Sequence, residues 1–425
     1  MERAEESPTR RDPVVAPSDL QPVGRPFITR YILSVAGGSL LFLAPLLVSL
    51  ALKVNDLVGI DDAPANLALV TGVGSLLAMV SNPLFGRLSD RTTSRAGMRR
   101  PWMITGLAGG TIGTLTVAVA PNIGVVLAGW CIAQVFLNAL LAAQIAVLPD
   151  HVPPSQRGTV SGLLGLCLPA ASVVGTYLVQ AFDGSTLTMF LAPLVVGGVL
   201  VGAFTVTLDD RRLDPADRPP WSLRQLAGTF YVNPRANPDF AWAFTSRFML
   251  VMAYAFLVTY QAYYLLDAIG VREEDVARQI YLGTLAQSAA LVAASPLTGR
   301  LSDRVGRRKV FVVVAAAVYA VALLVIATAS GLGGYLVGMA IGGLGFGMYM
   351  AVDLALVVDV LPDTDSSAKD LGVLNIAGAL PFALAPALAP AVLGITDNSY
   401  TALYLVAAGC AVVGATAILP IKRVR

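Results

Sequence analysis

The chain has few of the side chains that catalysis and metal binding require. Its 425 residues include a single histidine, His151, and three cysteines, and only 13% of them are charged. The cysteines (Cys131, Cys167 and Cys410) lie within apolar runs, which indicates packing residues rather than a disulfide framework. The sequence has no Gly-x-x-x-x-Gly-Lys-Ser/Thr loop, which excludes direct drive by ATP. The apolar runs supply neither a nucleophile–base pair nor a set of metal ligands, so we expect neither enzyme activity nor a cofactor.

Apolar residues, in contrast, are abundant. They make up 56% of the chain, and the mean hydropathy is +0.71. Most of the apolar runs are long enough to cross ~30 Å of hydrocarbon as helices, so the bilayer is the expected environment. A net charge of +2 gives no sign of a nucleic-acid partner, and we expect a monomer. Twelve spans are predicted, at 28–52, 66–85, 102–120, 122–147, 159–181, 188–208, 240–266, 277–298, 310–329, 331–360, 370–395 and 399–420.

Positive charge is distributed unevenly between the loops. With the N-terminus inside, all but three of the 29 lysines and arginines (Lys53, Arg272 and Arg278) fall on the cytoplasmic side. This asymmetry predicts a multi-pass protein of the cell membrane with both termini in the cytoplasm. The first 26 residues are polar and proline-rich, which is typical of a disordered tail and not of a signal peptide.

Two segments of the chain recur at one fixed offset. Gly86–Arg91 and Gly299–Arg304 both read Gly-Arg-Leu-Ser-Asp-Arg, 213 residues apart, and Leu148–Asp150 recurs at the same offset as Leu361–Asp363. Matches in register across half a chain indicate two copies of a unit of roughly 200 residues. We therefore predict an all-α integral membrane protein with twelve transmembrane helices in two pseudo-symmetric six-helix halves. Its parts are a disordered cytoplasmic tail (1–27), an N-terminal half (28–208), a cytoplasmic linker (209–239), a C-terminal half (240–420) and a short tail (421–425).

The second copy of the repeat carries the most specific motif. Gly299–Lys309 resembles the loop signature of the major facilitator superfamily at every defining position. The first copy is four residues longer before its glycine, Gly97, and this form resembles the sucrose–proton and glycoside–cation symporter branches. Together with the twelve spans and the duplication, the resemblance covers the whole chain. It implies the major facilitator fold and transport of a small molecule by alternating access.

The repeated loops are predicted to form a conformational latch on the cytoplasmic side. The glycines lie at helix ends, where a missing side chain lets another helix approach. The aspartates can accept hydrogen bonds from a neighbouring helix N-terminus, and the arginines can pair across the halves. Alternatively, the arginines only set topology, which leaves the fixed Gly-x-x-x-Asp spacing unexplained. The predicted latch residues are Gly86, Asp90, Arg91, Gly299, Asp303, Arg304 and Arg307.

A single carboxylate, Asp353, lies deep in a predicted span. A lone carboxylate in hydrocarbon is expected to be protonated or paired with a cation. Arg247 is the only arginine about two turns inside a span on the same side of the membrane. We hypothesise that Asp353 binds the coupling proton and that Arg247 is its partner, so that the proton gradient is the energy source. The alternative is a static salt bridge between the seventh and tenth spans.

The resemblance implies that spans 1, 4, 7 and 10 line a central cavity. In span 7, Arg247, Tyr254 and Gln261 are seven residues apart and therefore share one stripe of the helix. The neighbouring Tyr260 and Tyr263 have an alternative place in the outer aromatic belt. Amides and tyrosines suit a neutral, hydroxyl-rich substrate, although each also suits interhelical packing. The predicted substrate-binding residues are Gln134, Asn138, Tyr254, Gln261, Tyr264 and Asn375.

The direction of transport has a weaker signal. The drug–proton antiporters of the superfamily carry an arginine in span 4 and a Gly-Pro motif in span 5. Here span 4 has no charge, and Pro169 follows a leucine. We therefore predict proton-coupled symport of a sugar-like solute, with proton-coupled export of a drug or small metabolite as the alternative. Uniport also fits if Asp353 is only structural.

Overall fold

The computed structural model describes residues 21–218, 235, 237–360 and 367–421, and these ranges are helical apart from short connections. Most of the two predicted tails, the middle of the predicted linker and the second Leu-Pro-Asp copy lie outside them. The first half contains α1 (Arg25–Ala44), the π-helical turn η2 (Pro45–Ser49), α2 (Leu50–Val58), α3 (Ala63–Asp90), α4 (Arg100–Ala118), α5 (Ile123–His151), α6 (Pro154–Gly165), α7 (Cys167–Ala181) and α8 (Thr186–Thr207). A 3₁₀ turn, η3 (Pro215–Asp217), follows. The second half contains α10 (Pro238–Tyr263), the π-helical turn η4 (Tyr264–Ala268), α11 (Glu273–Val305), α12 (Arg308–Ala327), α13 (Leu332–Val360), α14 (Ser367–Ile395) and α15 (Tyr400–Ala417).

The twelve predicted spans each correspond to a helix or to a run of joined helices, which confirms the predicted fold class. Within the described ranges, eleven of these are long and apolar enough to cross a membrane. The twelfth, α4, contains four glycines and four threonines in its 19 residues, which lowers its hydropathy. Large apolar side chains such as Ile112, Val199 and Val206 are exposed, which is expected of a protein that lies in a bilayer.

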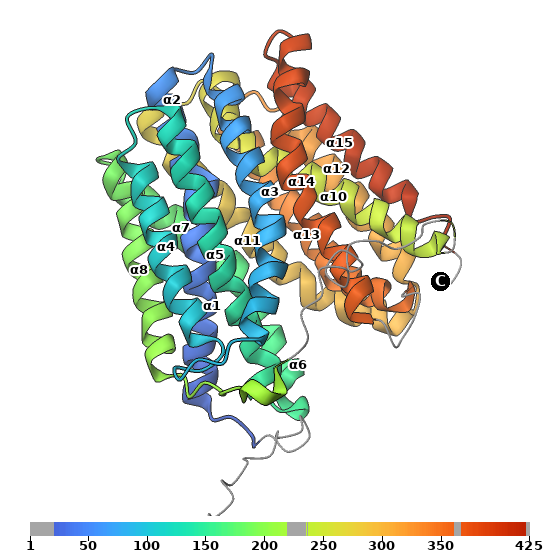
Figure 1. Ribbon diagram of the computed structural model, residues 1–425. Helices are drawn as coiled ribbons and strands as arrows, with labels where there is room; N and C mark the ends of the chain where they lie inside the picture. The colour runs from blue at the N-terminus through green and yellow to red at the C-terminus, as the bar shows by residue number, and fades with distance from the viewer. Residues whose placement is uncertain (1–20, 219–234, 236, 361–366, 422–425) are drawn as a thin grey trace, which may run out of the picture.

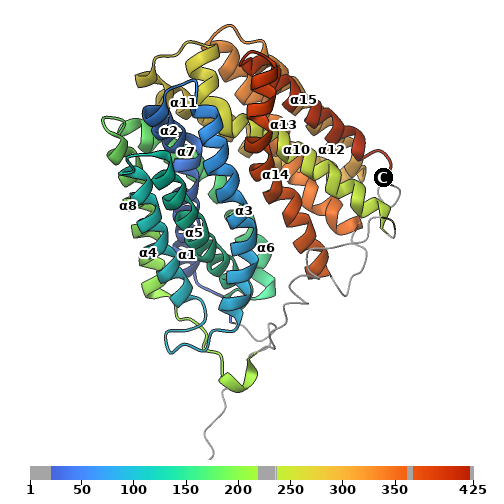
Figure 2. The same ribbon diagram turned by 45° about the horizontal axis from the view of Figure 1, so that its top comes forward.

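The helices form two groups that lie side by side (Figures 1 and 2). Helices α1–α8 pack mainly on one another, as do α10–α15, and the two groups meet along α3 against α14 and α7 against α11. The two hexapeptides end α3 and α11, and we call this end of the bundle the signature end. The opposite end, where α2 passes to α3 and η4 to α11, is the far end.

Three helices are interrupted, and in two of them a proline removes a regular hydrogen bond. Pro45 has no N–H to donate to the carbonyl four residues earlier, and the π-helical turn η2 begins there. Pro169 likewise leaves the carbonyl of Gly165 without its helical partner, and α6 and α7 are divided at Leu166. In the second half, η4 contains no proline, and its π-helical turn closes through the bond from Ile269 N to Tyr264 O.

The tightest packing joins α11 and α13. A Cβ atom at Gly343 would overlap the backbone carbonyl of Gln287, and one at Gly347 would lie 2.7 Å from the carbonyl oxygen of Leu291. The two helices therefore approach with backbone against backbone. Glycines at these two positions make this close approach possible.

Candidate functional site

An ion pair joins the two helices whose lone buried charges were singled out in the sequence. Arg247 on α10 pairs through Nη1 with Oδ2 of Asp353 on α13, and the two side chains are 21% and 8% exposed. The hydroxyl of Tyr349, one turn earlier on α13, donates to Oδ1 of Asp353 at 2.5 Å. Both carboxylate oxygens are therefore engaged. No described residue accepts a hydrogen bond from the buried Nε of Arg247.

A second contact between α10 and α13 lies two helical turns from the ion pair. The ring of Tyr254 stacks on that of Phe346 with centroids 4.5 Å apart and planes at 12°. Tyr254 follows Arg247 by seven residues, and Phe346 precedes Asp353 by seven. Because the helices run antiparallel, the ion pair and the ring stack are equivalent contacts along one seam. Phe382 of α14 meets the edge of the Tyr254 ring, with centroids 6.1 Å apart.

Next to this stack is a small cavity between the two halves. Its volume is about 40 Å³, which is room for no more than a few water molecules. None of the lining residues is charged. They come from η2 and α7 of the first half and from α10, α11 and α13 of the second: Leu47, Leu168, Pro169, Ser172, Tyr254, Val258, Gln261, Thr284, Gln287, Ser288, Leu291 and Phe346.

The predicted stripe on α10 is only partly at this cavity. Tyr254 and Gln261 line it, and the Oε1 atom of Gln261 accepts a hydrogen bond from the hydroxyl of Tyr335 at 3.2 Å. Tyr264 instead lies in the interior of the second half, where its hydroxyl donates to the carbonyl of Ile326 at 2.6 Å. The prediction from α10 missed the polar residues of α11 that line the cavity, Thr284, Gln287 and Ser288. Their spacing in the sequence is the same whether such side chains bind a solute or pack against another helix.

The predicted amides outside α10 lie elsewhere. Asn138 donates to the backbone carbonyl of Gln134 on the same helix at 2.8 Å and accepts from Asn82 of α3 at 3.4 Å. Neither Gln134 nor Asn138 lines the small cavity. The hydrogen bond between Asn82 and Asn138 joins α3 to α5, as the packing alternative expects, and the substrate-binding role of Gln134 and Asn138 stays a prediction. Asn375 lies in α14, but its side chain is outside the described part of the structure.

At the signature end of the first half, a buried arginine binds two carboxylates. Arg99, which is 4% exposed, lies 2.7 Å from Asp90 and 2.7 Å from Asp150 and also donates to the hydroxyl of Ser89. Asp90 was predicted to accept from a helix N-terminus; in this conformation its described partner is the side chain of Arg99, and Asp210 accepts from the start of α4. Its Oδ2 atom accepts from the backbone N–H groups of Arg99 (2.6 Å) and Arg100 (2.7 Å). The sequence marked Asp150 only as part of a repeat and did not identify Arg99 or Asp210.

Burial raises the pKa of Asp210, and the two backbone hydrogen bonds lower it, with the net shift upward. The charge of Asp210, which lies outside the spans, therefore depends on its burial and on these two hydrogen bonds. It holds the start of α4 against the end of α8, while Arg99 holds the ends of α3 and α5 together. The cluster ties four helices of one half and makes no described contact with the other half.

The two repeated glycines of the predicted latch are not closely approached in this conformation. A Cβ atom at Gly86 would meet open space, and one at Gly299 would lie 4.0 Å from Ala351, so no helix approaches closely at either glycine. The halves are in contact nearer the far end, which is the physical reason for this difference. Arg304 and Arg307 are exposed, Arg91 is half-buried, and the side chain of Asp303 is outside the described part.

Contacts between the halves at the far end centre on two tyrosines. Tyr260 and Tyr263 of α10 are both fully buried, so their suggested place in the outer aromatic belt is wrong. The hydroxyl of Tyr263 donates to the carbonyl of Ala51 at 3.1 Å and also lies 3.5 Å from that of Ala63; Tyr260 lies 3.4 Å from the carbonyl of Pro64. A belt tyrosine and a buried one have the same hydropathy, so the sequence could not separate them.

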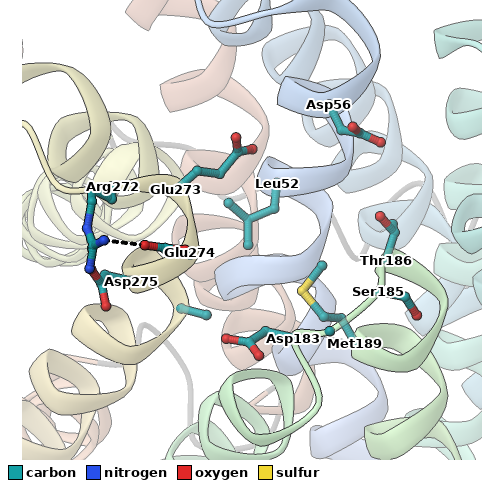
Figure 3. Close-up of a pocket in the computed structure, with 12 residues that line it drawn as sticks. Leu52, Asp56, Asp183, Ser185, Thr186, Met189, Arg272, Glu273, Glu274 and Asp275 are labelled. Atoms are coloured by element: carbon teal, nitrogen blue, oxygen red, sulfur yellow. Dashed lines mark hydrogen bonds and ion pairs between the residues drawn. The ribbon is translucent and has the colours of Figure 1, made fainter.

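Beside this tyrosine contact is a larger, acidic cavity of about 690 Å³ (Figure 3). Asp183 reaches it from the first half and Glu273 from the second, and Arg272 at its edge pairs with Glu274 at 2.5 Å. Asn55 of α2 donates to Glu273 across the halves at 3.0 Å. The far end is thus closed by hydrogen bonds beneath an open, negatively charged mouth.

We expect Tyr263→Phe to open the far end more often. The change removes one hydroxyl donor to a carbonyl of the other half, a net contribution of about 1 kcal/mol or roughly fivefold in population. The measurement is the rate at which a membrane-impermeant maleimide labels Leu47→Cys, at the small cavity between the halves, in a background without the three native cysteines. Tyr404→Phe is the matched control, because its buried hydroxyl has no described partner. Equal labelling rates in both variants would contradict the role of this contact.

Comparison with known proteins extends the likeness from the loops to the whole chain. The family model of the Major Facilitator Superfamily matches residues 27–277 and 275–425. A crystal structure of the nucleoside transporter NupG superposes with a TM-score of 0.71 at 14% identity, over 93% of this chain and 99% of that one. A bacterial homologue of the human lysosomal transporter Spinster, in an inward-facing and unoccupied conformation, gives 0.66 at 15% identity, over 94% and 99%. No curated protein matches the sequence.

Proposed function

The chain belongs to the major facilitator superfamily and is a multi-pass membrane transporter of a small solute, and from this premise we propose that it is a proton-coupled symporter of a sugar-like solute. Its signature end is proposed to face the cytoplasm, and its substrate to be neutral. Of the two relatives by structure, one transports nucleosides, which are also neutral rings with hydroxyl groups, but at 14% identity that likeness concerns the fold.

The observation that carries the proton coupling is the ion pair of Arg247 and Asp353. Moving a carboxylate and a guanidinium out of water is costly, and a buried pair is often no more stable than apolar side chains of the same size. Ionisable residues within membrane spans are accordingly functional sites by default. Here the pair is on α10 and α13, which meet again at the wall of the cavity between the halves.

The ion pair offers a simple proton cycle. When Asp353 is ionised, it holds Arg247 and thereby joins α10 to α13. When a proton binds to Asp353, the charge attraction is lost, and the two helices are free to separate. One proton crossing a 100 mV potential provides about 2.3 kcal/mol, which is enough for more than tenfold accumulation of a neutral solute. A single titrating carboxylate is therefore sufficient. Cross-half contacts of Arg91, Arg304 and Arg307 are proposed to form when the signature end closes.

The experiment is transport into proteoliposomes by the purified protein. Uptake of a panel of neutral sugars and nucleosides is measured with and without an imposed inward proton gradient, and the proton flux is recorded. We expect at least one solute to accumulate more than tenfold, and only with the gradient. Uptake to the same level without a gradient would make the protein a uniporter. Extrusion of a hydrophobic dye, with no uptake of any solute, would favour proton-coupled export.

A further inference from the structure

One buried polar group at the cavity between the halves has no partner. Gln287 on α11 is 8% exposed and lines the cavity, and no described residue accepts a hydrogen bond from its Nε2 atom. Burying an amide donor without an acceptor is unfavourable, so an unpaired one in a folded protein requires an explanation. The sequence did not single out this residue.

The backbone at Gln287 is held in place by the tightest contact in the second half. Its carbonyl packs against Gly343 of α13, where no side chain fits. The unpaired amide therefore sits on a backbone that cannot shift to find an acceptor without separating α11 from α13. A backbone fixed in this way limits the positions that the amide can take and keeps it within reach of a group that enters the cavity.

The other residues that line the cavity indicate which class of molecule carries a group that would pair with this amide. All twelve lining residues are uncharged, so a charged solute would find no counter-ion there. The stacked rings of Tyr254 and Phe346 present an apolar wall, and the hydroxyls of Ser172, Thr284 and Ser288 add donors and acceptors. Apolar walls with a few fixed polar groups are typical of sites for small neutral molecules.

We propose that Gln287 is a substrate-binding residue that donates its amide N–H to an oxygen or nitrogen acceptor of a neutral solute with a ring. The class comprises sugars, cyclic polyols and nucleosides. This inference rests on the proposed function, because it assigns a residue and a substrate chemistry to the same transport cycle. Gln287, Tyr254 and Phe346 form the second-half wall of the site, and Ser172 faces them from the first half.

The cavity is contracted in this conformation. Its volume of about 40 Å³ is far below the ~300 Å³ at which sites for small molecules begin. Because α7 supplies one wall and α11 the other, separation of the two halves enlarges the site without moving Gln287 relative to Gly343. Solute is proposed to bind in the open form of the site, where the amide of Gln287 has room to donate to it.

The test measures binding to the purified protein in detergent without any proton gradient. The probes are D-glucose, sucrose and uridine, with D-glucuronate and glucosamine as charged counterparts, and the signal is stabilisation against heat. The neutral probe that binds best is then compared with its monodeoxy analogues on the parent protein and on Gln287→Leu. Gln279→Leu, eight residues earlier on the same helix and away from both cavities, is the matched control.

We expect Gln287→Leu to weaken binding of the neutral probe about tenfold and to leave binding of one monodeoxy analogue unchanged. The empty variant should be at least as heat-stable as the parent, because no hydrogen bond is lost. Stronger binding of a charged probe, no binding of any neutral probe, no loss in the variant, or an equal loss for every analogue would each overturn the proposal. Failure of the proton gradient to drive uptake would overturn only the proposed coupling, since this assay contains no gradient.

Discussion

Asp353→Asn is expected to abolish accumulation of solute driven by a pH gradient, while solute still exchanges downhill across the membrane. Asparagine keeps the shape of the side chain and a hydrogen bond with Tyr349, but it cannot take up a proton. It also leaves Arg247 with a buried charge and no counter-ion. Removing one partner of a buried pair costs about 3–5 kcal/mol, so a drop in thermal stability should accompany the loss of coupling.

The double variant Arg247→Met/Asp353→Leu separates the two effects. It removes both charges, and replacing a buried pair by apolar side chains of similar size is often neutral or stabilising. We expect this protein to be as heat-stable as the parent and to exchange solute without coupling to protons. The measurements are the transition temperature in detergent, exchange of labelled solute, and accumulation under the imposed gradient. Gradient-driven accumulation that survives Asp353→Asn would reduce the pair to a static link between α10 and α13.

The second large effect is expected from a single methyl group. Gly343→Ala places a Cβ atom into the backbone carbonyl of Gln287, and a backbone carbonyl cannot rotate away as the end of a side chain can. Overpacking of this kind costs roughly 3 kcal/mol, because α11 and α13 must separate along their contact. We expect a lower yield of monodisperse protein, a lower transition temperature and weaker solute binding.

Gly409→Ala on α15 is the matched control for this change. Both residues are glycines inside a helix, but a Cβ atom at Gly409 meets nothing within 4 Å. Alanine there should be neutral or stabilising by up to about 1 kcal/mol, because it restricts the unfolded chain and favours the helix. Equal transition temperatures for the two variants would contradict the backbone contact between α11 and α13.

Most of the fold could be predicted because it is determined by the hydrocarbon of the lipid bilayer. Hydrocarbon requires continuous apolar helices, so the twelve spans are visible in composition alone, and the repeated hexapeptides relate one half to the other. Among the described helices that correspond to predicted spans, α4 has the lowest hydropathy over its most apolar stretch, and it packs closely against α5. The pairing of Arg247 with Asp353 was also accessible, because two isolated charges at the same depth have few other partners.

The rest depends on which face each residue turns to its neighbours. The sequence around Tyr263 is compatible with a place at the membrane surface and with a place between the halves, and only the packing of α10 against α2 distinguishes the two. Arg99, Asp150 and Asp210 are loop and helix-end residues separated by 51 to 111 positions, and nothing local indicates that they meet. Gln287 has the same ambiguity, since an amide in a span serves packing and binding equally well.

Each half of the protein supplies only part of the wall of the small cavity, so neither half forms the site alone. A solute bound at the proposed site between α7 and α11 contacts both halves, so its binding favours whichever arrangement of the halves fits it best. A ligand with very high affinity would hold the halves in that one arrangement and stop the cycle. Good cargo for this protein should therefore bind weakly, and the tightest-binding member of a ligand series should be its inhibitor.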